Sequence, residues 1–83
     1  MTGMLLYDDR HDRFMVEELI DNLISEESRV RDLHCGDCLT IAVKRDDWRE
    51  TRIEKDLDDV FGWYFVGVGR AAPLIGHPVK IAD

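Results

Sequence analysis

Residues 39–54, LTIAVKRDDWRETRIE, decide the fold of this chain. The apolar side chains of the first half stand at every second position: Leu39, Ile41 and Val43. This period of two is typical of a strand with one buried face. The polar residues 45–47 suit a turn, and residues 48–54 return as a second strand. The stretch therefore predicts a β-hairpin.

Short strands are also predicted on both sides of this hairpin. They cover residues 4–7, 63–68 and 78–81, with residues 13–16 either a strand or the lead into a helix. Aromatic and β-branched residues make 63–68 the most strand-like of these. Alternation puts one of two pairs into the core, together with Val79 and Ile81. The alternatives are Trp63 with Phe65, or Tyr64 with Val66.

One segment follows the period of a helix instead. Its apolar residues form a single stripe at helical spacing: Val16, Leu19, Ile20, Leu23 and Ile24. Glu17, Glu18 and Asp21 would occupy its first turns, where the helix dipole favours negative charge. The pattern predicts a helical insertion over about residues 16–28.

The order of these elements predicts a mainly β fold with one helix. A small SH3-like antiparallel β-barrel with a helical insertion fits it best. A length of 83 residues allows one domain, residues 1–83. The sequence contains no apolar run of membrane-spanning length and no signal-peptide pattern, so we expect a cytoplasmic protein.

The net charge of −7 restricts the kinds of partner. An acidic chain lacks the attraction that drives binding to phosphate backbones, which argues against direct nucleic-acid binding. One alternative is therefore an acidic inhibitor that mimics nucleic acid. Asp8, Asp9 and Asp12 crowd one predicted turn, but the calcium-loop pattern is absent and we expect a solvated turn there.

Cys35-Gly-Asp-Cys38 is the one motif with a chemical alternative. Two thiolates are half of the four ligands of a structural zinc site, and His34 or His77 would have to be among the others. The motif precedes a strand rather than a helix, which argues against redox chemistry. A turn at Gly36-Asp37 explains it most simply, so we expect neither metal nor cofactor. No phosphate loop or nucleophile elbow occurs, and we expect no enzyme.

Trp48 and Arg52 form the candidate partner-binding site. Both lie on one face of the second hairpin strand, which allows a cation–π contact there. Tryptophan and arginine dominate binding hot spots, so an exposed pair predicts a surface for an unknown protein partner. The alternative is a tryptophan that covers one open end of a small barrel. The sequence does not indicate the oligomeric state.

Four ordered motifs resemble a family of small uncharacterised Firmicutes proteins. They are Leu33-His-Cys-Gly-Asp-Cys38, Trp48-x-x-Thr51-Arg-Ile-Glu54, Gly62-Trp-Tyr-Phe-Val-Gly67 and Gly76-x-x-Val79-x-Ile81. The family is a domain of unknown function that occurs among mobile-element accessory genes. The resemblance implies a small single domain and carries no activity with it. Residues 17–32 are longer and more helical than the family pattern.

Overall fold

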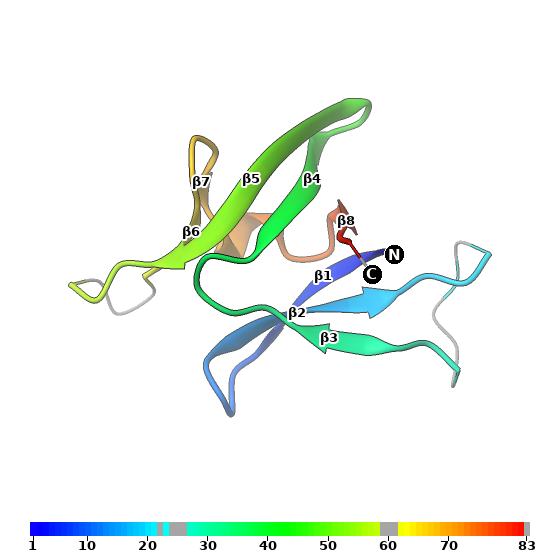
Figure 1. Cartoon of the computed structure of the whole chain (residues 1–83), viewed down its shortest axis with the longest axis horizontal. Coiled ribbons are helices and arrows are strands. Elements are labelled where there is room, and N and C mark those ends of the chain that lie inside the picture. The colour runs from blue at the N-terminus through cyan, green and yellow to red at the C-terminus, as the bar shows by residue number, and fades with distance from the viewer. Residues whose placement is uncertain (22, 24–26, 59–61, 83) are drawn as a thin grey trace.

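A computed structural model describes residues 1–21, 23, 27–58 and 62–82. Within these residues, eight strands form one antiparallel sheet in the order β3-β2-β1-β8-β4-β5-β6-β7. The strands are β1 (Thr2–Asp8), β2 (Arg13–Glu18), β3 (Val30–Asp32), β4 (Cys38–Lys44), β5 (Asp47–Lys55), β6 (Trp63–Phe65), β7 (Gly69–Arg70) and β8 (Pro78–Lys80). Figure 1 shows β4 and β5 as a long twisted hairpin on one side and β1 to β3 on the other. Strand β8 joins the two halves by pairing with both β1 and β4.

The predicted hairpin is confirmed, and so are short strands near both termini. Strands β4 and β5 pair from Cys38 opposite Arg52 to Lys44 opposite Asp47. A bulge between Ala42 and Lys44 shifts the register near the turn. The strand predicted over 63–68 is shorter, because the chain turns after Phe65 and Gly67 takes a positive φ of 74°.

The predicted helical insertion over residues 16–28 is wrong. Strand β2 occupies the start of this segment and pairs with β1 at six positions. Beyond it, Ile20 and Leu23 face each other in an isolated antiparallel bridge, while Ile24 lies outside the described residues. The predicted stripe does not form one buried face: Val16 is fully buried in β2, whereas Ile20 is 38% exposed and Leu23 is 69% exposed. No helix in the described ranges is long and apolar enough to span a membrane.

The predicted closed barrel is also wrong, because the sheet is open. Strands β3 and β7 are its edges in the described part of the chain. Each is only two or three residues long, too short to form a ladder that would close the sheet through its backbone. The sheet nevertheless curls strongly: the rings of Phe14 on β2 and Trp63 on β6 have centroids 6.1 Å apart. The curl encloses one apolar cluster on the inner face.

The inner face carries the core. Its buried residues come from both halves of the sheet and from the connections between strands: Leu5, Phe14, Val16, Leu33, Leu39, Ile41, Ile53, Trp63, Phe65, Ala71, Val79 and Ile81. Of the two alternatives for β6, Trp63 and Phe65 point inward, whereas Tyr64 and Val66 are each 37% exposed. Val43 only packs against the edge of the cluster.

Replacement of Ile41 by alanine tests this placement. Because Ile41 is fully buried, Ile41→Ala should lower the free energy of unfolding by about 2–5 kcal/mol. Thr40→Ala, on the opposite face of the same strand, is the control and should cost less than about 1 kcal/mol. Urea unfolding of both variants measures the difference, and near-equal effects would contradict the assignment of the faces.

Candidate functional site

The outer face of the central strands holds the two residues that the sequence analysis selected. Opposed pairs in the sheet share a face, so Trp48 lies beside Ala42, and Glu50 lies beside Thr40. Thr40 also pairs with Lys80 of β8. We call this outer surface the Trp48 face, and its members are Thr40, Ala42, Trp48, Glu50, Arg52 and Lys80.

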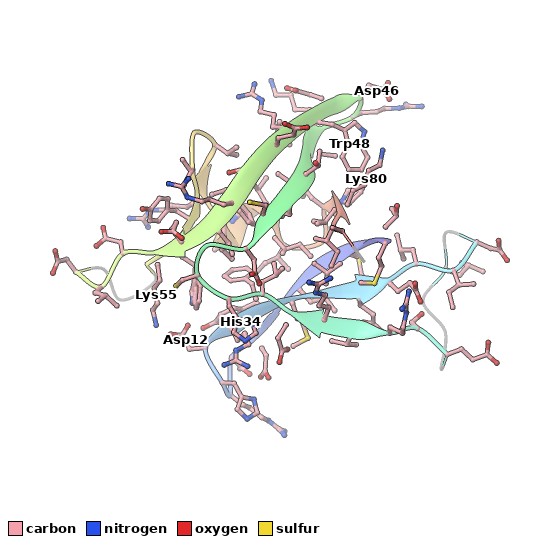
Figure 2. All side chains as sticks on the ribbon, viewed as in Figure 1. Asp12, His34, Asp46, Trp48, Lys55 and Lys80 are labelled. Carbon is pink, nitrogen blue, oxygen red and sulfur yellow. The ribbon has the colours of Figure 1, made fainter. Side chains whose placement is uncertain are left out.

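Trp48 is exposed and contacts a cation. Its side chain is 38% exposed and stands outside the core cluster, so it does not cover the end of a barrel. The cation is Lys80 and not Arg52, since the Lys80 ammonium lies 4.3 Å from the centroid of the Trp48 ring (Figure 2). Such a contact holds the indole in place while leaving part of it open to a partner. Arg52 shares the face but is farther along β5.

A shallow hollow adjoins Trp48 at the tip of the hairpin. Its volume is about 430 Å³. Its lining is Ala42, Lys44, Arg45, Asp46, Trp48, Gly76, His77 and Pro78. A hydrogen bond of 2.7 Å between His77 Nδ1 and the Ala42 carbonyl joins the two sides of the hollow. Lys44, Arg45 and Lys80 are exposed around this hollow, and the exposed Asp46 lies among them in the lining.

Residues 34–37 form the tight turn that was expected before β4. The Asp37 amide donates to the His34 carbonyl at 3.0 Å, and Gly36 takes a φ of 90°. Only glycine adopts such a φ without strain, which explains its place in the motif. The Asp37 carboxylate accepts from the His34 amide at 2.8 Å. Both cysteines are exposed, so they do not act as buried apolar residues.

The described residues do not bring a third ligand to the zinc site considered at Cys35 and Cys38. In the described ranges, no group of three or more His, Cys, Asp or Glu side chains is arranged to hold a metal ion. His34 lies near the Asp37 carboxylate, while His77 faces the Ala42 carbonyl at the other end of β4. Neither His34 nor His77 is therefore grouped with Cys35 and Cys38 as a metal ligand.

The acidic face expected on the helix does not form. Glu17 and Glu18 are successive residues of β2 and thus point to opposite sides of the sheet. Glu18 pairs with Arg29, with 2.8 Å between Oε2 and the Arg29 Nη2 nitrogen. This guanidinium holds the pKa of Glu18 below its usual value. Glu17 and Glu18 therefore do not form one continuous acidic surface that could imitate a nucleic acid.

Asp12 forms a network that the sequence analysis missed. Its side chain is 44% exposed in the turn and is also the acceptor for three other side chains. Oδ1 accepts from the Tyr7 hydroxyl at 2.6 Å and from the Trp63 indole N–H at 3.0 Å. Oδ2 accepts from the Lys55 ammonium. Lys55 and Trp63 are 43 and 51 residues away in sequence, so no local spacing could have indicated the network.

These hydrogen bonds shift two pKa values in opposite directions. The bonds from Lys55, Tyr7 and Trp63 stabilise the carboxylate and lower the pKa of Asp12 to about 2. The same carboxylate accepts a hydrogen bond from the neutral Tyr7 hydroxyl, and this bond, together with partial burial of the ring, raises the pKa of Tyr7 to about 12. Asp12 is therefore an anion, and Tyr7 a neutral donor, throughout the physiological range.

Comparison with protein families identifies residues 3–81 with a domain of unknown function, DUF5348. The expectation of an unknown-domain family is thereby confirmed. No curated protein matches the chain.

A solved structure shares the fold. It is the crystal structure of a protein from Ruminococcus gnavus, determined as a structural genomics target. The two chains are 33% identical, with a TM-score of 0.69, over 98% of this chain and 100% of the other. The likeness is one of fold and sequence.

Metal analysis tests the assignment of Cys35 and Cys38 to a turn. Two exposed thiols supply half of the four ligands of a structural zinc site, so purified protein should contain well under one zinc per chain. A chelator should leave the melting temperature unchanged, as should the double variant Cys35→Ser, Cys38→Ser. Stoichiometric zinc by elemental analysis would refute the turn, because structural zinc contributes directly to folding.

Acid unfolding tests the Asp12 network. The pKa of Asp12 is depressed from 3.8 to about 2 on folding, so its contribution is present above about pH 4 and is lost as the pH falls toward 2. Asp12→Asn should cost about 0.5–1 kcal/mol at pH 7, a small value because the side chain is 44% exposed. The difference in the free energy of unfolding between Asp12→Asn and the parent protein should become smaller as the pH falls toward 2.

Asp9→Asn is the control, since Asp9 is an exposed residue of the same turn. It should show no comparable loss at pH 7. A constant difference between Asp12→Asn and the parent protein from pH 7 to pH 2 would contradict the role assigned to the Asp12 carboxylate.

Proposed function

This chain belongs to the DUF5348 family, whose function is unknown, and we propose that it is a non-enzymatic interaction module. In this proposal the Trp48 face binds a protein partner, and no residue has a catalytic, metal-binding or cofactor-binding role. We place the module in the cytoplasm, where the exposed thiols of Cys35 and Cys38 would remain reduced.

The exposed indole of Trp48 carries the proposal. A large aromatic ring on the outer face of a sheet is costly to hydrate, and a partner gains by covering it. The Lys80 ammonium over the ring restricts its orientation before any partner arrives. Such preorganisation lowers the entropy lost on binding. Tryptophan and arginine on one face are also the residue types that most often dominate binding energy.

Charge favours an acidic partner segment at this face. The whole chain has a net charge of −7, which would repel acidic partners elsewhere on the molecule. Around the hollow beside Trp48, however, Lys44, Arg45 and Lys80 are exposed, with Asp46 as the acidic residue of the lining. Glu50 is an exposed acid of the same outer face, but Arg52 adds a guanidinium there, and guanidinium groups bind carboxylates in a bidentate manner. An aspartate- or glutamate-rich segment therefore suits the site.

Substitutions on the Trp48 face test the proposal. After a partner has been identified by capture from the source cell, Trp48→Ala and Arg52→Ala should each weaken its affinity about tenfold, or about 1.4 kcal/mol. Leu57→Ala is the matched control, because Leu57 is an apolar side chain that is 87% exposed and lies away from this face. Titration calorimetry with the purified partner measures all three affinities.

The rival acidic surface predicts another pattern. If the chain were an acidic inhibitor, charge reversal at Glu17 would weaken binding and the effect would fade at high salt. Trp48→Ala would then have little effect. That outcome would refute the Trp48 face as the binding surface.

A further inference from the structure

A second pocket lies at the opposite end of the molecule from the hairpin tip. It has a volume of about 160 Å³. We call it the aromatic pocket, and its lining is Tyr7, Asp12, Phe14, Trp63, Ala72 and Ile75. Its size is close to that of an engineered cavity of about 150 Å³ that binds benzene, so it suits one compact group. Figure 2 shows Asp12 and Lys55 together at this end, far from Trp48 and Lys80.

Three inclined aromatic rings form the walls of the aromatic pocket. The centroids of Tyr7 and Phe14 are 4.9 Å apart, with 49° between the ring planes. Phe14 and Trp63 meet nearly at right angles, with 72° between the planes. Rings inclined in this way present more than one face or edge to the same small volume. A cation over the face of any of these rings would be attracted by the electronegative ring face, whereas a neutral group of the same size would not.

The remaining polar wall is anionic. Asp12 Oδ1 is held by the Tyr7 hydroxyl and the Trp63 indole, so the carboxylate is fixed between two of the rings. Asp8 and Asp9 lie close enough in the same turn to act electrostatically on the Tyr7 hydroxyl. The aromatic pocket thus combines aromatic walls with one carboxylate, that of Asp12.

Lys55 shows that these groups accept a cation. Its ammonium pairs with Asp12 Oδ2 and lies 5.3 Å from the centroid of the Trp63 ring. Lys55 is not part of the pocket lining, so it shares the carboxylate and the ring without filling the volume. It also offsets part of the Asp12 charge, and a cation in the pocket would compete with it.

We propose that the aromatic pocket binds a methylated ammonium group. A free ammonium is strongly hydrated, and walls in which Asp12 is the only charged side chain would replace few of its hydrogen bonds with water. Methylation removes these donors, spreads the charge over apolar carbon and matches the walls. This site is separate from the Trp48 face and does not depend on the function proposed for that face.

Titration with tetramethylammonium chloride tests the charge, and tert-butanol provides the control. The two probes are similar in shape and size, but only the first is charged. We expect saturable shifts of the Trp63 indole N–H in NMR spectra and binding about fivefold to tenfold tighter for the cation. The Trp48 indole N–H is an internal control and should not move. Equal affinities for the two probes, or shifts at Trp48 instead, would overturn the proposal.

Two substitutions should change the affinity in opposite directions. Asp12→Asn keeps the shape and removes the charge, so it should weaken tetramethylammonium binding about fivefold or more. Lys55→Gln removes the competing ammonium and should strengthen binding. If Asp12→Asn fails to fold, Lys55→Gln still decides the matter, because weaker binding in that variant would overturn the proposal. Asp9→Asn, at an exposed site in the same turn, should cause the smallest change.

The source of the methylated ammonium is tested separately. Choline represents a small molecule, and a short peptide containing trimethyl-lysine represents a modified protein. Tighter binding of either probe supports the proposal and identifies the source. Loss of the Trp63 shift with both probes, under conditions where the chain is folded, would refute it.

Discussion

The carboxylate of Asp12 joins two parts of a sheet that does not close through its backbone. It belongs to the turn between β1 and β2, yet it accepts hydrogen bonds from Lys55 of β5 and Trp63 of β6. Phe14 and Trp63 meet just inside this link, at the rim of the apolar cluster. An open sheet with short edge strands would otherwise expose the core between its two halves. The side chains thus complete an enclosure that the strands leave unfinished.

The link through Asp12 places the aromatic pocket and the Trp48 face in different parts of the sheet. Closure at Asp12 places the aromatic pocket where the two halves meet, and its walls are partly core residues. The Trp48 face is formed on the other side of β4, β5 and β8, by residues outside the apolar core cluster. A sheet with one buried face can therefore present a recognition surface on its outer face and a small pocket at its seam.

Charge differs between these sites although the chain is acidic overall. The hairpin tip exposes Lys44 and Arg45 near Lys80, whereas the turn of the aromatic pocket contains Asp8, Asp9 and Asp12. Net charge alone argued against direct binding to nucleic acid. The fold instead gathers basic residues from β4, β8 and the turn between β4 and β5 into a local surface, which the total charge cannot reveal.

The sequence by itself determined the β4–β5 hairpin, the turn at Gly36 and the inward position of Ile41, because alternation and turn chemistry depend on neighbouring residues. It also placed Trp48 and Arg52 on one strand face. The helix predicted over residues 16–28 was wrong, because the segment that has helical spacing begins in strand β2, which pairs with β1. Only the tertiary structure decided that the sheet stays open, that Lys80 contacts Trp48, and that Asp12 meets Lys55 and Trp63. These contacts depend on the register and twist of the whole sheet, which no single stretch of sequence contains.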